Sequence, residues 1–389
     1  MVLISVRCLV VLRLNLCLWV SAAAATSVNI GMIYGTAWKK ALTHDLVKLA
    51  IQQGFRAFDT ANMPKHYNES LVGSALAEVL QDPTLGLRRE DLWIQTKFTP
   101  DACNGQPLDL QPYDTSKPVA DRVLASFAGS LQHLRVDYVD SLLLHAPFSR
   151  REDTLAAWRQ LETLHHQGLA RQIGVSNFHY SELNWLLAEA KVPPAFVQNR
   201  CLHKNSWDRE VRELCRERGI GYQGFWLLTG NRFVLGSGGL AEIAQRHSKT
   251  HQQVLFAFVM QQYGVIPLTG TRDAEHMAED LVVAAGNLSL APDELALLQT
   301  LAAEEFTDAD PVQVRFQNSL DAEIHVFWEQ PDSGRLFSQG VMTAGGSLER
   351  SSYHSHVFVM KAEGQVIQRW RANRGKGEAQ IVHVHHDEL

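Results

Sequence analysis

Several classes of protein are excluded by what this sequence does not contain. No Gly-x-Gly-x-x-Gly turn follows the first predicted strand, which disfavours a doubly wound dinucleotide-binding sheet. Lys and Arg number 36 against 42 Asp and Glu, so no basic excess exists to neutralise a nucleic-acid backbone. No Cys-x-x-Cys pair or Cys/His spacing indicates zinc, and we predict no metal site.

Cysteine is also scarce, with 5 in a chain of 389 residues. Cys8 and Cys17 lie in a predicted leader, which leaves Cys103, Cys201 and Cys215. Three cysteines allow one disulfide at most, so a small scaffold stabilised by disulfides is excluded.

Both ends of the sequence carry targeting patterns. Residues 1–25 combine an early Arg7, an interrupted apolar run and four alanines, which is typical of a secretory signal peptide. Residues 386–389 read His-Asp-Glu-Leu, an address that the retrieval receptor of the endoplasmic reticulum recognises. We therefore expect a protein of the endoplasmic reticulum lumen with that receptor as a partner and no stable membrane insertion. Asn68 and Asn287 begin two glycosylation sequons, as expected for a glycoprotein there.

From residue 26 to residue 308, short apolar runs rich in β-branched residues alternate with longer amphipathic segments. Eight strand–helix units over about 280 residues predict an α/β fold, a (β/α)₈ TIM barrel. The predicted strands are Val28–Ile33, Phe55–Asp59, Leu92–Lys97, Val139–Leu144, Gln172–Val175, Phe196–Gln198, Gly221–Phe225 and Gly264–Pro267.

Polar side chains gather where these predicted strands end. Asp59, Lys97 and His145 end or follow three early strands, and Ser176 and Gln198 occupy the same place later in the chain. Because active sites of TIM barrels are built at the C-terminal ends of the strands, this pattern predicts a site at that rim. The alternative is that strand ends are polar because they lead into loops.

The barrel sequence resembles the aldo-keto reductase family over nearly its whole length. The matching segments are Gly35–Trp38, Gly54–Ala61, Tyr67–Glu69, Val72–Gly73, Gln95–Lys97, Asp137–His145, Gly174–Phe178, Val197–Asn199 and Ile266–Thr271. The resemblance implies an oxidoreductase that reduces aldehydes or ketones, its small carbonyl substrates, by hydride transfer from NAD(P)H.

The resemblance also implies the catalytic groups: a Tyr that donates a proton, a Lys that lowers its pKa, an Asp that holds the Lys and a His that orients the carbonyl. Asp59, Lys97 and His145 match three of these places. The Tyr place is shifted, because the loop after Asp59 is longer than the family pattern and Tyr67 directly precedes the Asn of that pattern. Tyr67 is the first candidate for the proton donor and His66 the second. The third possibility is a catalytically weak or inactive barrel that serves as a binding protein.

Cofactor contacts follow from the same resemblance. Ser176, Asn177 and Gln198 match residues that hold the nicotinamide carboxamide. Phe225 matches an aromatic residue that stacks on the nicotinamide ring, and it retains the necessary apolar face. Simple packing at the barrel end is the alternative for Gln198 and Phe225.

The end of the site that takes a 2′-phosphate departs from the family pattern. Leu268 and His276 stand where the family commonly has cations, while Thr269 and Arg272 remain as candidate contacts. Because fixed cations select for the phosphorylated cofactor, their loss weakens that selection. We predict NADP as the cofactor, with NAD as the alternative.

A second, all-β domain is predicted for residues 312–385. Strand-like alternations occur at Val312–Phe316, Glu323–Trp328, Leu348–Ser351, His356–Lys361, Gln365–Arg371 and Gln380–Val384. This small sandwich resembles the von Hippel–Lindau β domain, whose pocket binds hydroxyproline. The resemblance implies a hydroxyproline-containing peptide as a partner, held by Trp328, Ser352, His356 and Phe358. The alternative is a core tryptophan beside a polar hairpin.

Overall fold

The computed structural model describes residues 30–100, 110–308, 312–329, 336–352, 357–371 and 380–384. The predicted leader, the C-terminal tetrapeptide and His356 lie outside these ranges.

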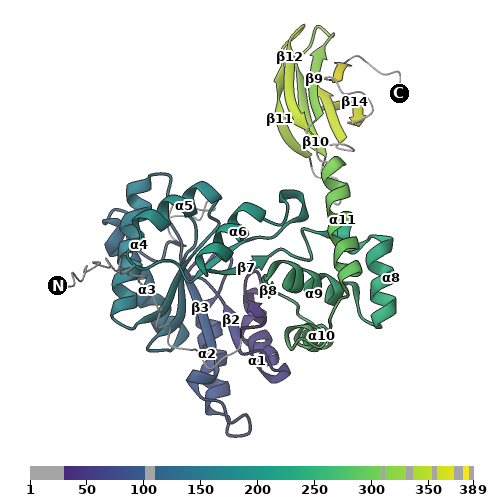
Figure 1. Cartoon of the computed structure of the whole chain (residues 1–389). Coiled ribbons are helices and arrows are strands. Elements are labelled where there is room, and N and C mark those ends of the chain that lie inside the picture. Colours follow the sequence, from purple (N-terminus) through teal and green to yellow (C-terminus); the bar gives the residue numbers. More distant parts are fainter. Residues whose placement is uncertain are drawn as a thin grey trace, which may run out of the picture.

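Eight parallel strands close into a barrel in the order β1 to β8, with helices around it (Figure 1). The predicted TIM barrel is therefore confirmed. Its strands are β1 (Ile33–Gly35), β2 (Ala57–Asp59), β3 (Trp93–Phe98), β4 (Val139–Leu144), β5 (Ala170–Ser176), β6 (Phe196–Arg200), β7 (Gly221–Phe225) and β8 (Ile266–Thr269).

One α-helix follows each of the first six strands, and three lie between β7 and β8. The helices are α1 (Thr43–Gln53), α2 (Glu69–Gln81), α3 (Val119–Leu134), α4 (Arg151–His166), α5 (Tyr180–Glu189), α6 (Arg209–Arg218), α7 (Arg232–Leu235), α8 (Gly238–His247), α9 (His251–Tyr263), α10 (Ala274–Ala284) and α11 (Pro292–Asp308). Short 3₁₀ turns occur at Lys40–Leu42, Arg89–Asp91 and His203–Asn205.

The barrel interior changes from apolar to charged along the strands. Alternate residues of β3, which share one face of a strand, show the order: Trp93, then Gln95, then Lys97. Trp93 packs edge-on against Phe196 of β6 in an apolar floor, with ring centroids 5.6 Å apart. The floor fills the lower barrel, so the polar and charged side chains of β3 that point inward lie toward the C-terminal rim.

The first strand begins later than predicted. The prediction was Val28–Ile33, whereas β1 starts at Ile33 and pairs with β2 and β8 from there. Gly31 instead passes close to helix α10, where a Cβ atom would lie 2.8 Å from the carbonyl oxygen of Ala284. Residues 30–32 therefore pack against a helix end, which hydrophobicity alone does not distinguish from a strand.

The C-terminal strands form two sheets, as predicted for an all-β unit beyond α11 (Figure 1). One sheet has the order β11-β10-β13-β14, and in the other β9 pairs antiparallel with β12 and parallel with β15. The strands are β9 (Val312–Asn318), β10 (Ile324–Glu329), β11 (Leu336–Met342), β12 (Ser347–Ser352), β13 (Val357–Ala362), β14 (Gln365–Arg371) and β15 (Gln380–Val384).

Strand β11 was not predicted, and its pairing explains why. The register of β11 against β10 shifts between Val326 and Phe327, and Gly340 of β11 has a φ of 141°. A bulge of this kind breaks the alternation of inward and outward residues on which strand prediction depends.

Within the described residues, no helix combines the length and hydropathy needed to cross a bilayer. Over the same ranges, no three His, Cys, Asp or Glu side chains are grouped as metal ligands. Cys201 and Cys215 are buried free thiols, so they do not form a disulfide with each other.

Candidate active site

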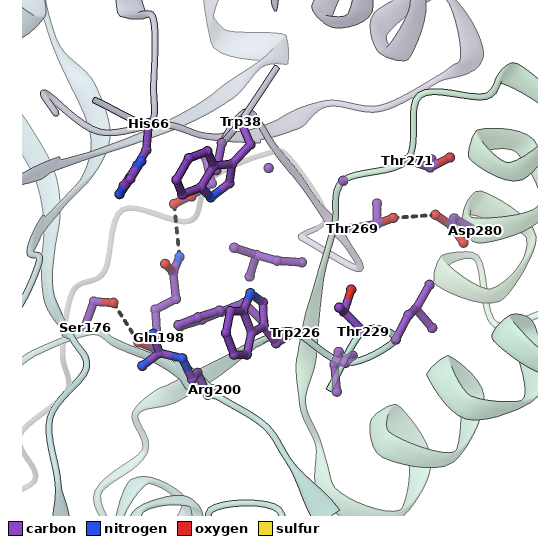
Figure 2. Close-up of a pocket in the computed structure, with 18 of the residues that line it drawn as sticks. Trp38, His66, Ser176, Gln198, Arg200, Trp226, Thr229, Thr269, Thr271 and Asp280 are labelled. Atoms are coloured by element: carbon purple, nitrogen blue, oxygen red, sulfur yellow. Dashed lines mark hydrogen bonds between the residues drawn. The ribbon is translucent and has the colours of Figure 1, made fainter. Parts of the chain in front are cut away.

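A cavity of about 840 Å³ opens at the C-terminal rim of the barrel (Figure 2). Asp59, His66, Tyr67, His145, Ser176, Asn177, Gln198, Phe225 and Thr269 are the sequence-predicted residues that line it. In Figure 2, His66, Ser176 and Gln198 lie on one side, Thr269, Thr271 and Asp280 on the other, and the indoles of Trp38 and Trp226 between them. Lys97 and Arg272 are not among the lining residues.

A buried ion pair, Asp59 with Lys97, lies at the inner side of the cavity, which is the side that Tyr67 and His145 line. The Lys97 ammonium donates to both carboxylate oxygens of Asp59, at 2.7 and 2.6 Å, and to the carbonyl oxygen of Thr60 at 2.9 Å. Burial lowers the pKa of Lys97, and the adjacent Asp59 carboxylate opposes that effect. Because an ammonium has three N–H donors, these contacts account for all of them.

A network of three glutamines holds the Asp59 carboxylate from the other side. The side-chain amides of Gln95 and Gln198 donate to Asp59 Oδ1 at 2.7 and 3.0 Å. Both amides also donate to Gln223 Oε1, at 2.8 and 2.9 Å. Only Gln198 was predicted from the sequence. Gln95 and Gln223 were missed because they are 128 positions apart and give no local signal.

The loop that carries Tyr67 is anchored at both ends. The Asn62 side chain donates to the carbonyl oxygen of Ser126 in α3 at 2.8 Å. Glu69, at the start of α2, accepts hydrogen bonds from Thr96 of β3 and from Ser130 of α3. These contacts hold the extended loop against the barrel, with Tyr67 and His66 both at the cavity.

Tyr67 does not meet Lys97 in the predicted way. The Lys97 Nζ lies over the Tyr67 ring, 5.3 Å from its centroid, while its hydrogen bonds go to Asp59 and Thr60. Burial raises the pKa of Tyr67, and the Asp59 carboxylate raises it further. Burial and Asp59 outweigh the lowering of this pKa that the resemblance implies, and Lys97 gives its hydrogen bonds to Asp59 and Thr60 rather than to the phenol. The cause is the shifted Tyr, which presents its ring face to the ammonium.

His66, the second candidate donor, stacks against Trp38. Their ring centroids are 3.8 Å apart, and the Trp38 backbone N–H donates to the His66 carbonyl oxygen at 2.7 Å. His66 Nδ1 is buried and has no hydrogen-bond partner among the described residues. Burial lowers the pKa of His66, with a smaller contribution from the nearby Lys65 cation. The ring is thus held neutral beside an exposed indole.

His145 contacts both Tyr67 and a threonine that the sequence did not single out. The His145 and Tyr67 rings meet edge to face with centroids 6.1 Å apart. Burial holds the His145 pKa well below its usual value, and the Lys97 cation adds to this. The His145 Nδ1 lies 2.7 Å from the Thr99 hydroxyl, and the Tyr113 hydroxyl donates to the Thr99 carbonyl oxygen at 2.6 Å. A neutral ring at this position has one N–H, and Thr99 helps to decide which nitrogen carries it.

The three residues predicted to hold a carboxamide come together at the ends of β5 and β6. The Ser176 hydroxyl donates to the Gln198 carbonyl oxygen at 2.8 Å. The Asn177 side-chain amide donates to the His145 carbonyl oxygen at 2.9 Å, and Asn177 itself has a φ of 57°. This left-handed conformation, which Asn tolerates better than most residues, turns the chain at the rim.

Phe225, the predicted stacking residue, lies beside a guanidinium. Arg200 is 5.5 Å from the Phe225 ring centroid and 4.8 Å from the Trp226 ring. Both Phe225 and Arg200 line the cavity, whereas their pairing was not visible in the sequence. Arg200 therefore places a positive charge over the aromatic wall.

The opposite end of the cavity lies between β8 and α10. The Thr269 hydroxyl donates to Asp280 Oδ2 at 2.7 Å, and burial raises the pKa of Asp280 to about 6. Arg272 donates instead to the Trp38 carbonyl oxygen at 3.0 Å. Lys39 is buried behind this end and donates to the Gly270 carbonyl oxygen at 2.8 Å. Burial lowers the pKa of Lys39 to about 8.

The candidate peptide site of the sandwich is described only in part. Trp328 of β10 and Phe358 of β13 pair directly across the sheet. Phe358 is buried against Phe316 and Trp370 in the sandwich core, so its ring is not at the surface. Trp328 is half-buried against Phe337. His356 and the side chain of Ser352 lie outside what the structure describes.

Comparisons with known proteins agree with the barrel. The model of the aldo/keto reductase family matches residues 30–303. Glyoxal reductase of Bacillus subtilis is 30% identical over 271 residues, which cover 69% of this chain and 87% of that protein. Deoxymugineic acid synthase 1 of Oryza sativa subsp. japonica is 32% identical over 263 residues, 62% of this chain and 76% of that protein.

Solved structures show the same fold. An aldo-keto reductase of the silkworm Bombyx mori has a TM-score of 0.58 in its complex with NADP, at 23% identity over 69% of this chain and 88% of that chain. A second silkworm enzyme of this kind has a TM-score of 0.59 at 25% identity, covering 70% of this chain and 83% of its own. From the family match and the sequence identities, the chain belongs to the aldo/keto reductase family.

Proposed function

We propose that the barrel reduces aldehydes or ketones with a reduced nicotinamide dinucleotide. One observation carries the proposal: the buried Asp59–Lys97 pair meets Tyr67 and His145 at one cavity, which Asp59, Tyr67 and His145 line. The family supports an oxidoreductase of this class, and the three-dimensional arrangement of this chain supports the reaction.

The cavity fits a nicotinamide dinucleotide at this inner side. A volume of about 840 Å³ lies within the range of cofactor sites, and it combines an aromatic wall with a few polar groups. Ser176, Asn177 and Gln198 would hold an amide, and Phe225 offers a face for a planar ring. A bound reduced nicotinamide would supply the hydride. The silkworm structure with NADP supports this cofactor class for the fold.

Two side chains of this protein face the growing charge on a carbonyl oxygen. Negative charge appears on that oxygen during reduction and needs a hydrogen-bond donor and a proton. Tyr67 is the proton source, since a phenol is protonated at neutral pH and burial raises the pKa of this one further. His145, neutral because its pKa is lowered, offers an N–H rather than a positive charge.

Lys97 acts through its position beside Tyr67. When the phenol gives up its proton, the new negative charge lies near the Lys97 ammonium, which attracts it. Asp59 and the glutamine network keep the ammonium in place and limit its movement toward the cavity. The buried pair thus serves catalysis more than stability, because burying two charges costs about as much as their attraction returns.

Binding and turnover are measured separately to test this proposal. Reduced nicotinamide dinucleotide should quench the fluorescence of Trp38 and Trp226, which line the cavity. The Trp226→Phe variant is a matched control that should lose part of the quench. Added benzaldehyde should then be converted to benzyl alcohol while the cofactor is oxidised. Saturable quenching without turnover would instead favour a catalytically inactive barrel that works as a binding protein.

We propose further that the reaction takes place in the endoplasmic reticulum lumen. Support comes from the sequence patterns of residues 1–25 and 386–389, which lie outside the described residues. Asn287 is exposed in the loop after α10, whereas Asn68 is partly buried and accepts a hydrogen bond from the Leu71 backbone at the start of α2. In cells, a glycan sensitive to endoglycosidase H should therefore be found on Asn287. Its absence, with the protein in the cytosol, would contradict this location.

For the sandwich, we propose binding to a hydroxyproline-containing peptide. The sequence resemblance supports it, together with the half-buried Trp328 beside Phe337. The buried Phe358, which lies beside Trp328 on the same face of the sheet, supplies packing rather than a wall for the ligand. Titration of the full chain with a hydroxylated peptide and its unhydroxylated copy tests the proposal, and equal or absent binding contradicts it.

A further inference from the structure

The far end of the cavity, away from Tyr67 and His145, is lined by carboxylates rather than cations. Its lining residues come from β8, the loop after it and α10, and are Leu268, Thr269, Gly270, Thr271, His276, Glu279 and Asp280. No Lys or Arg is among them, and Arg200, which lines the cavity elsewhere, lies against Phe225 and Trp226 instead.

Asp280 and Thr269 form the buried part of this end. The two side chains are 4% and 5% exposed and lie 2.7 Å apart. Because the Thr269 hydroxyl donates its hydrogen bond to Asp280, it offers a further ligand only lone pairs. With a pKa of about 6, Asp280 is ionised at neutral pH and accepts hydrogen bonds.

Two cations, Arg272 and Lys39, lie behind this end and give hydrogen bonds to backbone carbonyl groups there. Arg272 donates to the Trp38 carbonyl oxygen and Lys39 to the Gly270 carbonyl oxygen. Neither side chain lines the cavity. Among the side chains that line this end, Glu279 and Asp280 are the acids, and His276 is the one that can carry a positive charge.

We infer that this end takes an adenosine whose ribose has a free 2′-hydroxyl and rejects one with a 2′-phosphate. The inference rests on the proposed function, because a dinucleotide with its nicotinamide near Tyr67 must place its adenosine at the opposite end. A ribose hydroxyl donates to a carboxylate, whereas a 2′-phosphate brings up to two negative charges toward Asp280 and Glu279. NADH, rather than the phosphorylated cofactor expected from the family, is then the preferred cofactor.

Binding of adenosine fragments tests this end of the cavity without any reaction. The full chain is titrated with ADP-ribose and with 2′-phospho-ADP-ribose by calorimetry, and with NADH and NADPH by tryptophan quenching. In each pair we expect the unphosphorylated ligand to bind at least about tenfold more tightly. Equal affinity, or tighter binding of the phosphorylated ligand, overturns the inference and leaves the proposed function standing. Failure of all four ligands to bind overturns both.

Two variants test whether the charge at this end of the cavity causes the preference for ligands without a 2′-phosphate. Asp280→Asn keeps an acceptor for Thr269 and removes the charge. It should therefore reduce the difference in affinity between unphosphorylated and phosphorylated ligands, mainly by strengthening binding of the phosphorylated ones. Leu268→Lys adds a cation to the lining and should do the same without touching the Thr269–Asp280 pair. Glu275→Gln is the matched control, because Glu275 is exposed on α10 and does not line the cavity. An unchanged ratio in Leu268→Lys, or an equal change in Glu275→Gln, contradicts the inference.

Discussion

The Lys97 ammonium lies over the ring of Tyr67, 5.3 Å from its centroid, while all three of its hydrogen bonds go to Asp59 and Thr60. The cation therefore influences the phenol through space and through the ring face. This arrangement follows from the longer loop after β2, and it has consequences for both catalysis and stability.

Replacing Lys97 alone should damage folding as well as turnover. Lys97→Met leaves the Asp59 carboxylate buried without its cation, and loss of one partner of such a pair costs about 3–5 kcal/mol. The double variant Asp59→Asn/Lys97→Met removes both charges and should recover most of that stability, while remaining inactive. Denaturant unfolding and aldehyde reduction are measured on both variants. Turnover in the stable double variant would contradict the assigned site.

Tyr67→Phe separates the two candidate proton donors. Loss of the phenol should lower kcat by about 10²–10⁴-fold with little change in cofactor affinity. His66→Asn should instead alter mainly the KM for the aldehyde, because His66 packs with Trp38 at the cavity wall. Wild-type activity in Tyr67→Phe with loss of activity in His66→Asn would reverse the assignment.

The pH dependence of kcat should carry the signature of Tyr67. Because burial and Asp59 raise its pKa, the phenol keeps its proton into the alkaline range. Activity should therefore not decline through loss of this proton in the range of about pH 9–11, where an ordinary tyrosine titrates. A decline centred in that range in the wild type, and absent in Tyr67→Phe, would contradict the raised pKa.

Thr99 is predicted to position His145 rather than to take part in the reaction. Thr99→Val removes the hydroxyl beside His145 Nδ1 with little change in volume, and should lower kcat by roughly tenfold. Thr99→Ser keeps the hydroxyl and should retain most of the activity. The readout that distinguishes positioning from packing is the NMR signal of the His145 ring nitrogens, whose tautomer should change in Thr99→Val alone. Equal loss in both variants points to packing.

Asp280 should make stability depend on pH. Its folded-state pKa, about 6, exceeds the ordinary value of 3.8, so the folded protein holds this proton more tightly than the unfolded chain does. The resulting stability is present at low pH and is lost as pH rises through about 6. Without nucleotide, the free energy of unfolding of Asp280→Asn should therefore rise relative to that of the wild type between about pH 4 and pH 7, by on the order of 2–3 kcal/mol. A difference that stays constant with pH, or that also appears in Glu275→Gln, would contradict this.

Much of the barrel was predictable because its information is local. Strand residues alternate between the barrel interior and the helices, and polar groups such as Asp59, Lys97 and His145 stand where apolar runs stop. The order of strands along the chain is enough to bring these three together, since the C-terminal ends of parallel strands in a closed barrel meet at one rim. The first strand and β11 were misjudged or missed where a close helix contact or a bulge replaced regular alternation.

The finer geometry of the site was not predictable, because it depends on contacts distant in sequence. The orientation of Tyr67 follows from the anchoring of its loop, including the bond from Asn62 to Ser126, which is 64 positions away. The pairing of Gln95 with Gln223 likewise joins opposite parts of the barrel. The presence of Thr99 beside His145 shows the same limit, because neither residue type indicates the other.

The reaction itself is tested most directly by following the hydrogen that is transferred. NADH carrying deuterium at both hydrogen positions of the nicotinamide C4 is incubated with benzaldehyde and the full chain, and the alcohol is examined by mass spectrometry. We predict that wild-type protein gives benzyl alcohol carrying deuterium on its carbinol carbon, and that the stable Asp59→Asn/Lys97→Met variant gives none. Unlabelled alcohol, or no alcohol from a protein that binds NADH, would contradict hydride transfer at this site.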